Sequence, residues 1–387
     1  MQSNTSPALL YNQSSPTLAQ PGEWSVRSWI HTIDPLRGIA AVAVVVQHAS
    51  QAWRVADSTS PFRATLFWLG AWGVTLFFVL SGFCIHLPNA RKLENNPEHE
   101  IDWRQFAYRR ARRLLPTHYA ALILSAFLAL FIQTELLTRP TAGSFLAHLF
   151  MVHVWYAPYF YSINAVFWSI AVECHFYACY PVYLVLRKRF GAGLTTFILL
   201  PLGLTIFFVA SIALQGGSKL ALQNLFLVSW WQWTLGATLA DIYVAGKSLK
   251  WTWVLTSRWS VPFWCLSSLS LGLADITVAH LHVNRWMLPV FCGGLLGSLA
   301  LREGSTKASP TLSYLGKFSY SIYLIHPIAF GLLFMLPGFR SVPAWAGVPL
   351  AVIAAIAASW LFYLLIERHF LSPSARRQSE AIGQSGT

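Results

Sequence analysis

The chain has 387 residues, of which 55% are hydrophobic and only 11% are charged. A soluble globular domain has about 25% charged residues, so a chain of this length could not cover itself with a solvated surface. The composition excludes an ordinary cytoplasmic enzyme and a disordered scaffold, and it predicts a polytopic helical membrane protein. The net charge of +13 would favour nucleic-acid binding in a soluble protein. Here the basic residues lie between apolar segments, so no nucleic-acid partner is expected.

Residues 1–30 are polar and rich in Ser, Gln and Pro, without the basic and apolar regions of a signal peptide. They are predicted to form a disordered tail. Residues 31–367 are predicted to form one transmembrane domain, and residues 368–387 a polar cytoplasmic tail. All five cysteines fall inside apolar segments without CxxC spacing, so neither a disulfide framework nor a metal site is predicted.

Ten apolar segments of about 20 residues predict an all-α bundle of about ten transmembrane spans. In chain order they are Asp34–Trp53, Ala64–Leu87, Leu114–Gln133, Ala165–Leu186, Leu194–Leu214, Leu222–Tyr243, Trp259–Asp275, Arg285–Leu301, Phe318–Leu336 and Ala344–Ile366. The segment Phe145–Trp155 is apolar but too short to span, and it is predicted to be a half-helix or interfacial segment.

The basic residues give the predicted orientation of these spans. With the N-terminus inside, twenty of the 27 Lys and Arg residues fall in the inner connections and six in the outer ones. Because cytoplasmic connections carry the excess of Lys and Arg, both termini are predicted to be cytoplasmic.

Ionisable residues inside predicted spans cost free energy to place in the membrane, so each is a functional candidate. The first span carries Asp34, Arg37 and His48. Arg37 and His48 are eleven residues apart, which is close to three helical turns, so both project from one face, about 16 Å apart along the axis. Asp34 is placed to orient Arg37. The alternatives are a snorkelling anchor for Arg37 and a hydrogen-bonded core histidine for His48.

Four arginines stand immediately before the third span, in the run RRARR from Arg109 to Arg113. Arg110 and Arg113 share a helix face, and guanidinium forks bind phosphate oxygens. The alternative is a positive boundary that binds anionic lipid. Arg109 and Arg112 have the same spacing, so the register stays open.

Two further motifs place polar groups in the membrane. Glu173 lies within the fourth span without an adjacent base, so it should be protonated or paired. Trp168 lies near the outer interface, where an aromatic belt is the default interpretation. Ser319, Tyr323 and His326 recur on one face of the ninth span, where interhelical hydrogen bonding is the alternative to a functional role. The acidic residues at span ends, Asp241, Asp275 and Glu367, are expected to be interfacial.

Together these stretches resemble the membrane acyltransferase-3 family, from about residue 31 to Glu367, in the family's order and spacing. The matching stretches are DPLRGIAA from Asp34, GVTLFFVLSGF from Gly73, RRARRLLP from Arg109, FWSIAVE from Phe167 and SYSIYLIHP from Ser319. Each motif is weak alone, and the five in order are specific.

The resemblance implies an integral membrane O-acyltransferase, in a bacterial inner membrane, that uses cytoplasmic acyl-CoA, acetyl-CoA above all, as donor. The acceptor would be a hydroxyl of a glycan, a lipid-linked sugar or a secreted small molecule. The family's motif residues fall on Arg37, His48, Arg110, Arg113 and Glu173. The chain is expected to lack the C-terminal hydrolase-like domain that some family members carry, and no permanently bound cofactor is implied.

Sequence and resemblance agree on one hypothesis. Arg37, Arg110 and Arg113 bind the donor, His48 is the general base, and Glu173 orients His48 or contacts the acceptor. An acyl-imidazole on His48 is the alternative to direct transfer.

Contacts with the acceptor are predicted for two further side chains, Trp168 and His326. Membrane lipids are further expected partners. The other function classes are a membrane transporter or exporter, in which buried charges line a pathway, and a non-catalytic lipid-binding subunit.

Overall fold

The computed structural model of the chain describes residues 30–53, 61–246, 252–274, 277–278, 281–302 and 309–371. The chain divides into two units, Met1–Ile30 and His31–Thr387, and the following concerns the second. The predicted tail at residues 1–30 lies outside the described residues except for Ile30. The predicted C-terminal tail is described only as far as Leu371, which is buried. Asp275 also lies outside the described residues.

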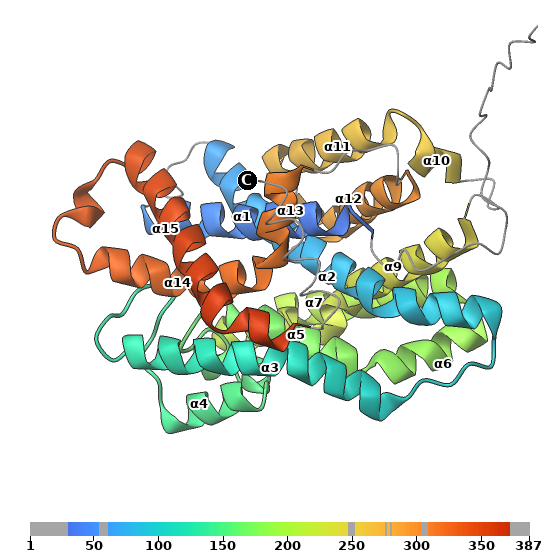
Figure 1. Cartoon of the computed structure of the whole chain (residues 1–387), viewed down its shortest axis with the longest axis horizontal. Coiled ribbons are helices and arrows are strands. Elements are labelled where there is room, and N and C mark those ends of the chain that lie inside the picture. Colours follow the sequence, from blue (N-terminus) through green and yellow to red (C-terminus); the bar gives the residue numbers. More distant parts are fainter. Residues whose placement is uncertain are drawn as a thin grey trace, which may run out of the picture. The chain divides into compact units, whose positions relative to one another are not determined.

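Each predicted apolar segment coincides with a helix or a bent helix pair, so the all-α class is confirmed (Figure 1). These helices are α1 (Ile33–Ala52), α2 (Pro61–Asn95), α3 (Trp103–Leu128), α5 (Phe167–Ala178) with α6 (Tyr180–Phe190), α7 (Ala192–Ala213), α9 (Phe226–Ala245), α11 (Ser260–Ala274), α12 (Val283–Leu301), α14 (Ser319–Phe334) and α15 (Ala344–Leu365). Shorter helices are α4 (Ala142–Leu149), η2 (His153–Trp155), η3 (Ala157–Tyr159), α8 (Gly216–Gln223), α10 (Trp253–Thr256), α13 (Pro310–Lys317), η6 (Phe339–Ser341) and η7 (Glu367–Phe370). An antiparallel pair, β1 (Thr277–Val278) and β2 (Leu281–His282), precedes α12.

Three helices in the described ranges are long and apolar enough to cross a membrane, namely Trp68–Asn95 within α2, α7 and α15. Counting each bent pair, α5 with α6 and α13 with α14, as one span raises the number to five. Helices α11 and α14 have only 15 and 16 residues, which is short for a hydrocarbon core about 30 Å thick. The number of ten spans and their orientation therefore remain predictions.

One of two bends interrupts a predicted continuous span, and the other lies at the start of one. The segment predicted at Ala165–Leu186 bends by 52° between α5 and α6, at Cys179. Pro181 lies in the first turn of α6, where its ring is tolerated but cannot continue the preceding helix. The chain bends by 72° between α13 and α14, just before the motif that carries His326.

Helix α3 begins eleven residues before the predicted span. Its N-cap is Asp102, whose side chain accepts a hydrogen bond from the backbone N–H of Gln105 at 2.9 Å. The whole arginine run from Arg109 to Arg113 therefore lies on the helix instead of before it. Apolarity marks only the part of a helix that lipid can surround, whereas capping marks where the helix starts.

Helix α2 packs against α1 and against α9 (Figure 1). A Cβ added at Gly82 would lie 1.8 Å from the carbonyl oxygen of Trp233, and one at Gly236 would lie 1.9 Å from that of Val79. The two glycines thus allow the backbones of α2 and α9 to touch, as small residues do in membrane helix pairs.

A polar network connects α2, α6 and α9 about one turn beyond this crossing, toward the C-terminal ends of α2 and α9. Arg187 donates to both carboxylate oxygens of Asp241 at 2.8 Å, and Asp241 lies 3.1 Å from Nε2 of His86. Nδ1 of His86 lies 2.8 Å from the hydroxyl of Tyr180, which also accepts from Asn89. Asp241 was expected to be interfacial, and its carboxylate instead ties three helices together.

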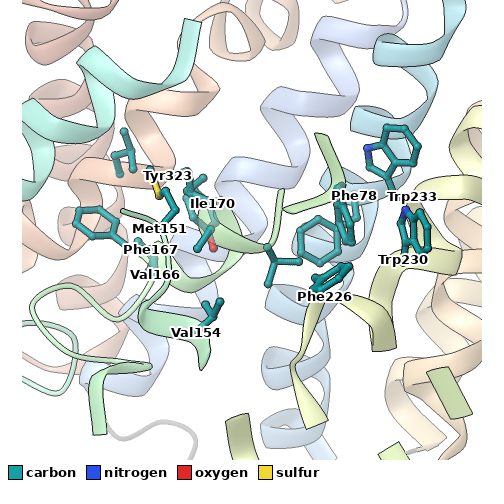
Figure 2. Close-up of a cluster of buried hydrophobic side chains, with 14 of the residues drawn as sticks. Phe78, Met151, Val154, Val166, Phe167, Ile170, Phe226, Trp230, Trp233 and Tyr323 are labelled. Carbon is teal, nitrogen blue, oxygen red and sulfur yellow. The ribbon is translucent and has the colours of Figure 1, made fainter. Parts of the chain in front are cut away.

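The core consists largely of aromatic and branched side chains contributed by α2, α5, α9 and the connection before α5. Figure 2 shows Phe78, Phe226, Trp230 and Trp233 in one group, and Phe167 with its apolar neighbours in another. Helix α5 supplies Phe167 and Ile170 to the second group, so the helix is anchored in the core.

The connection between α3 and α5 contains the segment predicted to be a half-helix or interfacial segment, and the short helices α4 and η2 cover most of it. Thr141 and Ser144 form a capping box at its start. Asn164 anchors the end of the connection, because its amide donates to the Ser125 hydroxyl at 3.0 Å and to the Leu324 carbonyl at 3.3 Å.

Candidate active site

Helix α1 carries both residues of the first predicted motif. Arg37 lies near its beginning and His48 near its end, on one continuous helix, so their axial separation is about 16 Å. Both side chains are half-buried. The predicted placement of a cation and an imidazole at two depths of one helix face is therefore present.

Arg37 lies in a cluster of polar side chains from four helices. It is within electrostatic range of Cys84 on α2 and of Glu173 and Tyr177 on α5, and the same groups surround Arg110 on α3. All five side chains are half-buried. We call these residues, Arg37, Cys84, Arg110, Glu173 and Tyr177, the arginine cluster.

Glu173 is the carboxylate of the arginine cluster. One of its oxygens accepts hydrogen bonds from the Ser81 hydroxyl, at 2.6 Å, and from the Tyr177 hydroxyl. Ser81 in turn accepts from the indole N–H of Trp233 at 3.3 Å. Glu173 is thus paired and hydrogen-bonded, as a carboxylate inside the membrane must be. Glu173 is close to Arg37 and Arg110. The catalytic role predicted for it stays a prediction.

The structure distinguishes between the two possible registers of the arginine run. Arg110 and Arg113 are half-buried, whereas Arg109 and Arg112 are exposed. Nε of Arg110 is buried and has no hydrogen-bond partner among the residues that the structure describes. An orphaned guanidinium nitrogen beside another arginine is suited to an anionic ligand.

Arg113 is engaged elsewhere. It forms an ion pair with Glu367 at 2.7 Å and lies over the ring of Tyr320. Glu367 is fully buried and also accepts from the backbone N–H and the hydroxyl of Ser321, at 3.1 and 2.5 Å. Glu367 was expected to be interfacial; its carboxylate is buried at the junction of α3, α14 and η7, where it accepts from Ser321 and forms an ion pair with Arg113.

His48 pairs with His326 of α14. Nδ1 of His48 lies 2.9 Å from Nε2 of His326, and the two rings stack with centroids 5.1 Å apart at 13°. His326 is fully buried, and its Nδ1 lies 3.0 Å from the carbonyl oxygen of Ile322. Both ring nitrogens of His326 are therefore engaged within the protein.

These partners fix the tautomers of two neutral imidazoles. A carbonyl only accepts, so Nδ1 of His326 carries the proton and its Nε2 accepts. Nδ1 of His48 must then be the donor between the rings, which leaves the lone pair of His48 on Nε2. The half-buried His48 thus presents its unprotonated nitrogen away from His326.

The remaining predicted residues line the same region. Tyr323 packs its ring edge against His326 and shares a 2.6 Å hydrogen bond with Ser169 of α5. Trp168, on the next position of α5, stacks on Phe160 with centroids 5.9 Å apart. Trp168 is half-buried, and its predicted contact with the acceptor stays a prediction.

Sequence patterns did not single out a group of buried histidines beside this region. His148 and His153 are fully buried and stack with centroids 3.7 Å apart, and His118 lies against Phe167. In the part of the chain that the structure describes, no three His, Cys, Asp or Glu side chains are arranged to hold a metal ion. The three histidines show no regular spacing in the sequence, because three different elements supply them.

Comparison with known families identifies the family of the chain. The family model described as an acyltransferase domain matches residues 30–364. The chain belongs to the acyltransferase-3 family. This confirms the resemblance carried by the five motifs, and it places the arginine cluster and the His48–His326 pair inside the acyltransferase domain.

Several bacterial proteins resemble this acyltransferase-3 chain. A peptidoglycan O-acetyltransferase of Listeria monocytogenes is 30% identical over 169 residues, covering 41% of this chain and 25% of the relative. A putative O-acetyltransferase of Staphylococcus aureus strain COL is 25% identical over 328 residues, covering 77% and 50%. A putative peptidoglycan O-acetyltransferase of Bacillus subtilis is 28% identical over 188 residues, covering 44% and 27%.

The chain spans half or less of the length of these curated relatives. No solved structure matches it. The family and the apolar helices together indicate an integral membrane protein.

Proposed function

We propose that this protein is an integral membrane O-acetyltransferase that moves an acetyl group from cytoplasmic acetyl-CoA to a carbohydrate hydroxyl. The observation that carries the proposal is the His48–His326 pair, which leaves Nε2 of His48 unprotonated on the helix that also carries Arg37. The names of the bacterial relatives support acetyl as the acyl group and a glycan as the acceptor.

The arginine cluster is the proposed donor site. Arg37 and Arg110 come from different helices and share one carboxylate neighbour, Glu173, and Asp34 is a second carboxylate within electrostatic range of Arg37. Guanidinium groups bind phosphate oxygens through charge-assisted hydrogen bonds. Among the described residues, Nε of Arg110 has no hydrogen-bond partner that a phosphate would have to displace. Arg113, bound to Glu367, holds α3 in place in this proposal instead of contacting the donor.

The distance between the two ends of α1 suits this donor. The axial separation of Arg37 and His48 is about 16 Å. An extended pantetheine arm has roughly the backbone length of four residues, which is about 14 Å. Phosphates held by the arginine cluster would therefore place the thioester near His48.

His48 is the proposed general base. Its Nε2 accepts the proton of the acceptor hydroxyl while the oxygen forms a bond to the acetyl carbon. The bond from that carbon to sulfur breaks, and the departing thiolate takes the proton from the imidazolium. His326 is a positioning residue in this scheme, because its nitrogens hold the His48 ring and are not free for the acceptor. Glu173 balances the arginines, and Trp168 remains the proposed acceptor contact.

The transfer test uses the full chain in nonionic detergent with radiolabelled acetyl-CoA and a glycan acceptor. His48→Ala should fold but lose transfer, whereas His369→Ala, which removes an exposed histidine, should keep it. Normal transfer by folded His48→Ala would overturn the base assignment. A transporter, which the family does not favour, would move acceptor unmodified and release no CoA thiol.

The donor site is tested by binding. Arg37→Gln and Arg110→Gln should each weaken CoA affinity about tenfold or more, the value of a charge-assisted hydrogen bond, and Arg112→Gln on the exposed face should not. CoA should slow maleimide labelling of Cys84, while the exposed Cys265 reacts at an unchanged rate. Equal CoA affinity in all three variants would refute the donor site.

A further inference from the structure

Arg285 lies in the first turn of α12 and is half-buried. Its Nη2 donates to the Gln223 carbonyl at 2.8 Å and to the Asn224 side chain at 3.1 Å. Among the described residues its other guanidinium nitrogens have no hydrogen-bond partner, and no carboxylate pairs with it, whereas Arg187 and Arg113 each have one. A half-buried cation at the start of a predicted membrane span, without a carboxylate partner among the described residues, is a functional candidate.

The surroundings of Arg285 are aromatic. Its guanidinium lies 4.9 Å from the ring centre of Phe207, whose edge packs against Trp286. Trp286 in turn stacks on Trp231 with centroids 6.1 Å apart. The indole N–H groups of both tryptophans are buried without partners in the described part of the chain. Ring faces with a few polar groups among them are typical of small-ligand sites.

Arg285 and His48 lie at the same end of the helices. The side chain of Gln47, the neighbour of His48 on α1, packs directly against Gly70 of α2. This part of α2 therefore contacts the end of α1. Two residues earlier on α2, Trp68 packs against His282, which precedes α12. The start of α12 is therefore at the level of His48 and not at that of the arginine cluster.

Tyr161 is electrostatically close to residues of both sites. Its hydroxyl is within electrostatic range of Arg285 and also of Tyr323. Tyr323 packs against His326, the partner of His48. Tyr161 is 40% exposed, so part of its side chain is open to a ligand bound at Arg285.

We propose that Arg285 and Tyr161 bind an anionic group of the acceptor, so that the acceptor is an acidic carbohydrate bearing a carboxylate or phosphate. This deepens the proposed transferase function and rests on it. The guanidinium offers its unpaired N–H groups to the anionic oxygens, and Tyr161 donates a hydrogen bond beside them. The rest of the glycan then reaches Nε2 of His48 in this proposal.

The experiment compares trigalacturonate with its fully methyl-esterified form, which keeps every hydroxyl but has no charge. Binding to the full chain in nonionic detergent is followed by tryptophan fluorescence, and acetyl transfer by radiolabel. Wild type should prefer the acid by about tenfold or more, and Arg285→Gln should lose that preference. Arg340→Gln removes an exposed cation that also lies over a phenylalanine, at 4.7 Å, and should keep it.

The outcomes separate the inference from the function it rests on. Equal binding of acid and ester, binding of neither, or an unchanged preference in Arg285→Gln overturns the anionic subsite even where transfer occurs. Binding of the acid through Arg285 without transfer from acetyl-CoA leaves the subsite and overturns the transferase. If added phosphatidylglycerol abolishes the preference in wild type, Arg285 binds lipid headgroups and the acceptor assignment is wrong.

Discussion

Replacing His326 provides a direct test of how the protein prepares its base. His326→Ala or His326→Leu removes the acceptor for Nδ1–H of His48, which lies 2.9 Å away. The imidazole can then adopt the other tautomer or turn within its site, so that Nε2 is no longer held toward the acceptor. We expect transfer to slow at saturating donor, with an unchanged affinity for CoA.

The size of the effect follows from the hydrogen bond that is lost. A bond between neutral groups contributes about 1 kcal/mol, and a buried donor left without a partner costs about 1–3 kcal/mol. Since about 1.4 kcal/mol corresponds to a factor of ten in rate, kcat should fall by roughly 5- to 150-fold. The loss is smaller than for His48→Ala, because the base itself remains.

A matched substitution separates positioning from packing. The side-chain oxygen of Gln can lie near the site of Nε2 of His326 and accept from His48, whereas Leu fills the space and accepts nothing. His326→Gln should therefore recover most of the rate that His326→Leu loses. His326 is fully buried, so thermal unfolding of each variant is measured alongside to exclude loss of the fold.

The assay is the initial rate of acetyl transfer over a range of donor and acceptor concentrations, with CoA affinity titrated separately. Wild-type kcat in a folded His326→Leu protein would refute the reasoning. Equal losses in the Gln and Leu variants would show that His326 contributes volume and not an acceptor.

Three further predictions concern stability. Gly82→Ala should destabilise by about 1–3 kcal/mol in denaturant unfolding, because its Cβ would lie 1.8 Å from the Trp233 carbonyl, and a neutral result would disprove the tight crossing. Glu367→Gln should cost about 2–3 kcal/mol, as its partner Arg113 is only 32% exposed, whereas Glu98→Gln at an exposed pair should cost less than about 1 kcal/mol. Burial holds the pKa of His148 at about 4, below its ordinary 6.5, so the unfolded chain binds more protons between these values. Stability should fall as pH drops from about 6.5 to 4, and His148→Gln should flatten that loss in melting curves.

Much of the molecule could be predicted from local pattern. The ten apolar segments match helices because apolar content and helical periodicity depend on neighbouring residues. Arg37 and His48 share a face because both lie on one helix, whose turn of 3.6 residues is fixed by the backbone. Helix ends were less accurate, since hydropathy does not detect the Asp102 cap that starts α3 or the bend at Cys179.

Partners across the bundle could not be predicted in this way. His48 and His326 are 278 residues apart, and only the packing of α1 against α14 brings them together. The arginine spacing allowed two registers, and burial of one face of α3 distinguished them. Arg113 met Glu367 instead of the arginine cluster because η7 brings that carboxylate against α3.

The sequence by itself therefore determined the membrane class, the helices and the few polar residues that lipid would not tolerate. Only the tertiary structure decided which of them face one another, because a side chain's partner depends on how distant helices pack and not on its neighbours in the chain. For His48 that distinction decides which nitrogen carries the lone pair, since the proton on its other nitrogen is held by a residue on α14.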